Sequence, residues 1–114
     1  MFTRLRGVEL LSATEVAGRM GIGPTGVRAL LQAGHLLSVP TDDGLRIPAE
    51  QLDGGVLVKH LVPVLTLLRD AGYSSEQALR WLTTPDDSLP GTPVQALVEN
   101  RGTEVKRRAQ ALGF

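Results

Sequence analysis

The chain has 114 residues, of which 42% are hydrophobic, enough for one compact domain or for a small domain with a packed extension. It has no cysteine, two histidines and only 4% aromatic residues, which excludes disulfides and cysteine-ligated zinc and argues against base stacking on aromatic surfaces. Lys and Arg number 12, as do Asp and Glu, so the chain lacks the basic surplus usual in proteins that bind phosphate backbones.

The amino-terminal residues Met1 to Leu11 mix apolar side chains with Arg4 and Arg6. This pattern predicts either a frayed lead-in or a short strand that pairs with a later hairpin. The two arginines could touch a phosphate backbone, although a solvated tail is the simpler interpretation. The stretch does not resemble a signal peptide, and no apolar run in the chain approaches about 18 residues, so we expect a cytoplasmic protein without a membrane span.

The stretch from Ser12 to Ile47 organises the rest of the chain. Ser12 and Glu15 form a capping-box pattern, which predicts a helix that begins after Ser12. The Gly-Ile-Gly turn that follows breaks this helix, and Pro24 suits the first position of a second one. Gly34 is expected to end the second helix.

Two short apolar runs, residues 35–39 and 45–47, come directly after the second helix. A turn that contains Asp43-Gly44 joins them, so they predict a two-stranded hairpin. Helix, tight turn, helix and hairpin is the layout of a winged helix-turn-helix, which commonly reads duplex DNA.

The second helix has an apolar face and a polar face. The apolar residues fall at i, i+3 and i+4, and they are Val27, Leu30 and Leu31. On the other face, Arg28 can pair with guanine and Gln32 with adenine in the major groove. Thr25 lies in the first turn, where its hydroxyl and the backbone amides can hold a phosphate. An ordinary solvated helix face is the alternative.

The hairpin offers few groups for phosphate contact. His35 is expected at the start of its first strand, where it could donate to a phosphate or simply bridge surface and core. The turn carries Asp42 and Asp43, which would repel a phosphate backbone. Arg46 on the returning strand is therefore the better candidate for a phosphate contact by the wing.

A helical turn at Pro48 to Leu52 is expected to close the wing, and Gly54-Gly55 is the one candidate hinge of the chain. The apolar run that follows predicts a short extended segment and then a helix from about Leu61, with Pro63 in its first turn. Because this helix is apolar on nearly every side, we expect it at the centre of a core or in a dimer interface.

The next predicted helix spans residues 76–83 and is capped by Ser74 or Ser75. Trp81 is expected to anchor the core, with a ligand-stacking role as the alternative. Asp86-Asp87 resembles a metal-binding pair, but no further carboxylate lies nearby, so a turn and a helix cap are expected there.

Thr92-Pro93 predicts the start of a helix over residues 94–99, and a last helix is expected over residues 103–112. The last helix carries the densest positive charge of the chain, which is Lys106, Arg107 and Arg108. This cluster could contact phosphates or an acidic partner. Equally, it could be a solvated helix end whose cations suit the helix dipole.

Residues Thr14 to Pro48 resemble the winged helix-turn-helix of the MerR and excisionase type, through the Gly-Ile-Gly turn, the Val-Arg pair, Gly-His-Leu and the final Arg-Ile-Pro. The second half is more specific. Val58-Lys59, Arg80-Trp81-Leu82, Thr84-Pro85-Asp86 and Arg107-Arg108-Ala109-Gln110-Ala111 stand in an ordered series. Together they resemble the small actinobacterial winged-helix DNA-binding proteins that are substrates of a membrane Ser/Thr protein kinase.

That resemblance implies DNA binding that weakens when the kinase modifies a threonine in a long amino-terminal tail. Here Thr3 is the only candidate, because the chain has almost no such tail. A second, shorter resemblance competes. Residues 89–97, followed by Gly102 and Val105, are similar to the toxin-binding domain of Xre/MbcA/ParS-type antitoxins.

These features predict a mainly α protein, with a winged helix-turn-helix and two-stranded wing at residues 1–53 and a helical bundle for dimerisation at residues 54–114. We expect a homodimeric, non-enzymatic regulator or nucleoid-associated protein that binds double-stranded DNA, without cofactor or metal, through the helix at residues 24–33. The expected contacts are Thr25, Arg28, Gln32, His35, Arg46, Lys106, Arg107 and Arg108. The alternatives are an antitoxin-like module that binds a toxin, or a helix-turn-helix that only oligomerises.

Overall fold

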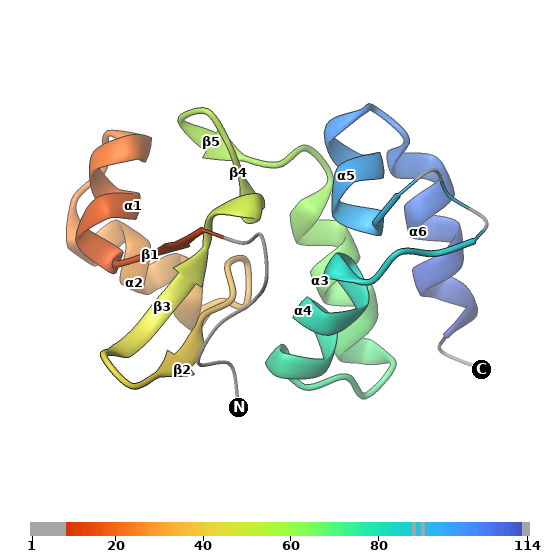
Figure 1. Ribbon diagram of the computed structural model, residues 1–114, viewed down its shortest axis with the longest axis horizontal. Coiled ribbons are helices and arrows are strands. Elements are labelled where there is room, and N and C mark those ends of the chain that lie inside the picture. The colour runs from red at the N-terminus through yellow and green to blue at the C-terminus, as the bar shows by residue number, and fades with distance from the viewer. Residues whose placement is uncertain (1–8, 88, 90, 113–114) are drawn as a thin grey trace. The chain divides into compact units, whose positions relative to one another are not determined.

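The computed structural model describes residues 9–87, 89 and 91–112, and it divides the chain into two compact units at Leu57–Val58 (Figure 1). The amino-terminal unit contains two helices and a three-stranded antiparallel sheet with the strand order β1-β3-β2. The bounds are β1 (Leu10–Leu11), α1 (Ala13–Met20), α2 (Pro24–Gln32), β2 (Val39–Thr41) and β3 (Gly44–Pro48). A 3-10 turn, η1 (Ala49–Gln51), then leads into the hairpin β4 (Leu52–Asp53) and β5 (Val56–Leu57).

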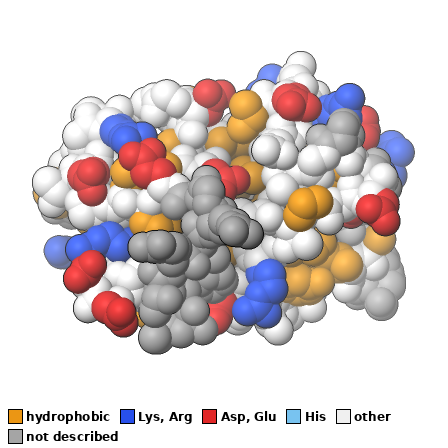
Figure 2. All heavy atoms as spheres, viewed as in Figure 1, with side chains coloured by type: hydrophobic (Ala, Val, Ile, Leu, Met, Phe, Trp, Pro, Cys, Tyr) orange, Lys and Arg blue, Asp and Glu red, His pale blue; other side chains and the backbone are white. Residues whose placement is uncertain are grey.

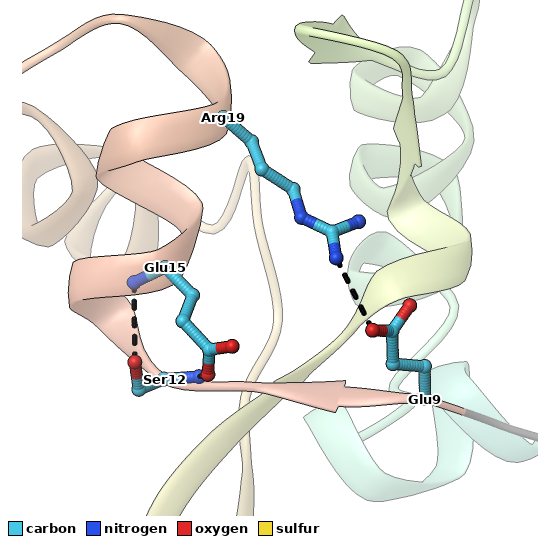
Figure 3. A network of polar contacts seen from close by, with 4 residues as sticks. All are labelled: Glu9, Ser12, Glu15 and Arg19. Atoms are coloured by element: carbon cyan, nitrogen blue, oxygen red, sulfur yellow. Dashed lines mark hydrogen bonds and ion pairs between the residues drawn. The ribbon is translucent and has the colours of Figure 1, made fainter.

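Helix α1 begins with the expected capping box (Figure 3). The Ser12 hydroxyl accepts from the Glu15 N–H at 3.1 Å, and the Glu15 carboxylate accepts from the Ser12 N–H at 2.9 Å. Both amides would otherwise lack a partner at the helix start. Gly21, in the left-handed region with φ +68°, ends the helix, so both predicted boundaries are confirmed.

Helix α2 packs on α1 and turns its apolar side into the core of this unit. Its end is closed by Gly34, at φ +75°, and by the His35 N–H, which donates to the Leu30 carbonyl at 3.0 Å. This six-residue closure is a helix-ending motif that favours glycine. The fully buried core residues of the unit include Leu11, Val16, Val27, Leu36 and Ile47.

The wing starts later than the sequence predicted. Strand β2 begins at Val39, which pairs with Arg46 of β3, and His35 lies outside the strand. The reason is that the His35 backbone closes α2, while the backbone of Leu37 bonds to the Gln51 side chain.

Strand β1 pairs with β3 through the register Leu10–Pro48 and Leu11–Ile47. The expected strand that pairs with the wing is therefore present. The candidate residues Thr3, Arg4 and Arg6 lie outside the described residues.

A buried glutamine fixes the connection between α2 and the wing. Gln51 is only 1% exposed, and its side chain forms a closed pair of hydrogen bonds with Leu37. Its Oε1 accepts from the Leu37 N–H and its Nε2 donates to the Leu37 carbonyl, both at 2.8 Å, with a weaker bond to the Pro48 carbonyl at 3.3 Å. The Gln51 side chain thus supplies the hydrogen-bond partners that a neighbouring strand would give, because the backbone at Leu37 belongs to no sheet.

Gly54 and Gly55, which the sequence suggested as a hinge, form the turn of the β4–β5 hairpin. Gly54 has φ +66°, a conformation that glycine adopts without steric cost. A Cβ on Gly55 would lie 2.9 Å from the backbone oxygen of Arg19, so this turn approaches α1 too closely for a larger residue.

The carboxyl-terminal unit is helical. Its elements are α3 (Leu61–Asp70), α4 (Ser75–Thr83), α5 (Pro93–Val98) and α6 (Gly102–Ala111), each within one residue of the predicted range. Ser74 and Thr92 cap α4 and α5 through capping boxes with Gln77 and Gln95. Helix α3 buries Leu61, Val64, Leu65 and Leu68, whereas Pro63 is exposed. None of the helices in the described part of the chain is long and apolar enough to cross a membrane.

Candidate nucleic-acid interface

The outer face of α2 carries the side chains expected to meet DNA. Thr25, Arg28 and Gln32 are all exposed on this helix, whereas Val27 on the opposite side is fully buried. The 3.6-residue period of the helix separates the two groups, as the sequence pattern requires. The structure therefore brings these three predicted residues together on one solvent-facing surface.

No side chain caps the first turn of α2, unlike the first turns of α1, α4 and α5. Its N-cap is Gly23, and Pro24 follows without an N–H. Gly26 keeps this turn compact, because a Cβ there would lie 3.2 Å from the Ile22 Cδ1 atom. The Gly26 and Val27 N–H groups donate to the Gly23 carbonyl at 2.9 and 3.3 Å, which leaves the Thr25 N–H as the first-turn amide that an anion could reach.

The wing tip is acidic, and the Thr41 side chain closes its turn with two hydrogen bonds. The Thr41 hydroxyl donates to the Gly44 carbonyl at 2.6 Å and accepts from the Asp43 N–H at 3.2 Å. Asp42 and Asp43 are exposed, so the tip presents carboxylates to solvent. Leu45, on β3 after the turn, is 63% exposed.

Arg46 is half-buried and lies along its own strand, where its Nη1 donates to the Leu45 carbonyl at 2.8 Å. The charge of Arg46 also acts on Glu15 of α1. Hydrogen bonds from Ser12 lower the pKa of Glu15, and the charges of Arg19 and Arg46 act in the same direction.

His35 and Arg19 differ from what the sequence predicts. His35 is half-buried in the turn after α2 rather than in a wing strand. Arg19, at the end of α1, was not anticipated as a charged feature of this unit. It forms an ion pair with Glu9 at 3.1 Å, with both side chains substantially exposed (Figure 3). Nothing in the local sequence marks that pair, because only the fold of β1 beside α1 brings the two residues together.

The three consecutive cations of α6 do not form one patch. Successive residues of a helix point about 100° apart, so Lys106, Arg107 and Arg108 face different directions. Lys106 Nζ lies 3.3 Å from His60 Nδ1, and Arg108 donates to the Glu104 carbonyl at 3.1 Å. Arg107 is exposed.

His60 connects α3 and α6 inside the carboxyl-terminal unit. It precedes α3 in the left-handed region, with φ +66°, and its ring lies over Gly102. A Cβ on Gly102 would clash with the His60 ring, so a larger residue there requires the ring to move. Desolvation first, and then the charges of Lys106 and Lys59, lower the pKa of His60.

Acidic and basic side chains are interspersed over the face of the molecule in Figure 2 and do not separate by sign. This agrees with the equal totals of acidic and basic residues. Among the described residues no cluster of His, Asp and Glu could hold a metal ion.

Two helices joined by a tight turn, a β2–β3 wing and an exposed polar face on the second helix define a winged helix-turn-helix protein. A family profile described as "DNA-binding protein Rv2175c, wHTH domain" matches residues 5–52. A second, described as "Rv2175c C-terminal domain of unknown function", matches residues 58–113.

The chain is 38% identical over 112 residues to the DNA-binding protein Rv2175c of Mycobacterium tuberculosis (strain ATCC 25618 / H37Rv), covering 87% of this chain and 77% of that protein. Its fold matches the NMR structure of Rv2175c with a TM-score of 0.88 and 32% sequence identity, over 100% of this chain and 87% of that one. The chain therefore belongs to the Rv2175c family of winged helix-turn-helix proteins.

These matches confirm the predicted fold class and the resemblance to small winged-helix DNA-binding proteins. They give no support to the antitoxin alternative, since the profile that matches the second half is the Rv2175c C-terminal domain. The likeness to the MerR type stays a prediction.

Proposed function

We propose that this chain binds double-stranded DNA and reads it with the outer face of α2. The observation that carries the proposal is the joint exposure of Thr25, Arg28 and Gln32 on the second helix of a winged helix-turn-helix. The family supports it, because the curated relative is named a DNA-binding protein. We propose that this DNA binding serves transcription regulation.

Each of the three residues takes a distinct role. Arg28 donates two hydrogen bonds to a guanine edge, and Gln32 forms a donor–acceptor pair with adenine. Thr25 holds a phosphate at the groove edge through its hydroxyl and its own N–H in the uncapped first turn of α2, which sets the register of the helix on the duplex.

The remaining cations contribute less to DNA binding. Arg46 contacts a phosphate from the wing, but Asp42 and Asp43 keep the tip itself away from the backbone. His35 and the α6 cations Lys106, Arg107 and Arg108 serve as flanking phosphate contacts. With so few positive groups in one copy, we propose that the carboxyl-terminal unit dimerises the protein, so that two copies of the amino-terminal unit bind DNA together.

Fluorescence anisotropy with a labelled pool of random duplexes tests the proposal. We expect binding by the full chain at about 50 mM salt and a steep loss of affinity at about 200 mM, because bound cations displace condensed counterions. Arg28→Ala should weaken binding by about 1–3 kcal/mol on a selected site. Arg80→Ala, an exposed helix arginine outside the proposed interface, serves as the matched control. Absence of binding at low salt would overturn the proposal.

A further inference from the structure

Trp81, the only tryptophan of the chain, does not lie in the core. Helix α4 buries the face formed by Ala78, Leu79 and Leu82. Trp81 belongs to the opposite stripe, where residues recur at i, i+3, i+4 and i+7: Gln77, Arg80, Trp81 and Thr84. The expectation that Trp81 anchors the core was therefore wrong, and its half-buried ring on the solvent side of α4 requires another explanation.

This stripe forms one wall of an open pocket. The pocket has a volume of about 330 Å³ and is lined by Tyr73, Gln77, Arg80, Trp81 and Thr84. Tyr73 comes from the turn before α4, where its N–H donates to the Leu68 carbonyl at 3.0 Å. Among the described residues, all five that line the pocket belong to one short segment, which is α4 with the turn before it.

The polar groups of the pocket are fixed by local hydrogen bonds. Gln77 Oε1 accepts from the Ser74 N–H at 2.8 Å within the capping box, which leaves the amide NH2 of Gln77 as a donor. The Thr84 hydroxyl donates to the Arg80 carbonyl. The α4 backbone therefore holds these side chains in place, and none of the five lining residues is a carboxylate.

The lining groups define the chemistry of a ligand. Two aromatic rings favour a flat apolar body, which can stack on or pack edge-to-face against them. Arg80 supplies a planar cation that recognises a carboxylate or phosphate, and the Gln77 amide adds a neutral donor. The volume stands at the lower end of the range for small-molecule sites, which favours a ligand with one or two rings.

We propose that the pocket of Tyr73, Arg80 and Trp81 binds a small planar ligand that carries an anionic group. This gives the carboxyl-terminal unit, which matches a domain described as of unknown function, a ligand-binding role separate from DNA reading. The pocket does not involve α2 or the wing, so the proposal stands or falls independently of DNA binding.

Three probes with the same ring and different charge test the proposal on the full chain: benzoate, benzyl alcohol and benzamidine. Because Trp81 is the only tryptophan, selective excitation reports on the pocket alone. We expect benzoate to change the Trp81 emission saturably and to bind about two- to fivefold more tightly than benzyl alcohol at low salt, with benzamidine the weakest. Arg80→Gln should abolish this ranking while leaving the binding of benzyl alcohol unchanged.

Saturation-transfer NMR on the ligand supplies a readout that does not need the tryptophan. Trp81→Ala should lose the benzoate signal, whereas Arg107→Gln, an exposed arginine on α6, should keep it. Circular dichroism of each variant verifies that the helices remain formed. Equal, non-saturating quenching by all three probes would overturn the proposal, as would an unchanged preference for benzoate in Arg80→Gln.

Discussion

Replacing Gln51 with leucine tests how helix α2 is joined to the wing. The substitution keeps the volume of a fully buried side chain but removes its hydrogen bonds to Leu37 and Pro48. The Leu37 N–H and carbonyl then lose their partners at a residue that is only 8% exposed. Each buried backbone group left unpaired costs about 1–3 kcal/mol, so we expect Gln51→Leu to lower the free energy of unfolding by about 2–6 kcal/mol.

That loss is a large part of the total stability of a small unit, which is about 5–15 kcal/mol for typical domains. Urea unfolding, followed by amide signals of residues 9–57, measures it directly. Gln32→Leu, at an exposed position of α2 in the same unit, is the matched control and should change the stability by less than about 0.5 kcal/mol. If Gln51→Leu unfolds within about 1 kcal/mol of the parent, the assignment of Gln51 as a required backbone partner is wrong.

Three further outcomes are expected. Gly102→Ala should destabilise the protein by about 1–3 kcal/mol, since its Cβ would meet the His60 ring; adding His60→Ala should recover most of the loss in thermal unfolding. Lys106→Met should raise the pKa of His60 measured by NMR. The pKa of His60 in the folded protein lies below its ordinary value of 6.5. The contribution of His60 to the stability of the fold is therefore fully present above pH 6.5, and it is lost as the pH falls through the folded-state pKa. The paired change Asp42→Asn and Asp43→Asn should tighten DNA binding about two- to fivefold in low salt, and a weakening would contradict the proposed repulsion at the wing tip.

Local signals in the sequence located most of the helices. The capping boxes at Ser12, Ser74 and Thr92 place helix starts because the bonding groups lie three residues apart in the chain. Glycines in the left-handed region mark the ends for the same local reason, as Gly21 and Gly34 illustrate. The amphipathic period of α2 likewise assigned its buried and exposed faces correctly.

The errors arose where distant residues decide the structure. The apolar run that starts at His35 favours a strand, but its backbone bonds instead to the end of α2 and to Gln51, which stands 14 residues after Leu37. The size and apolar character of Trp81 favour a core position, but residues 78, 79 and 82 occupy the inner face of α4. The ion pair between Arg19 and Glu9 depends on tertiary structure alone.

Amide NMR spectra of the full chain, recorded during titration with duplex DNA at low salt, test the central proposal most directly. We expect the largest shifts at Thr25, Arg28 and Gln32 of α2, with smaller shifts along β2 and β3, and we expect salt to reverse them. Shifts confined to residues 58–112, or none at all, would contradict the proposal that α2 reads the DNA.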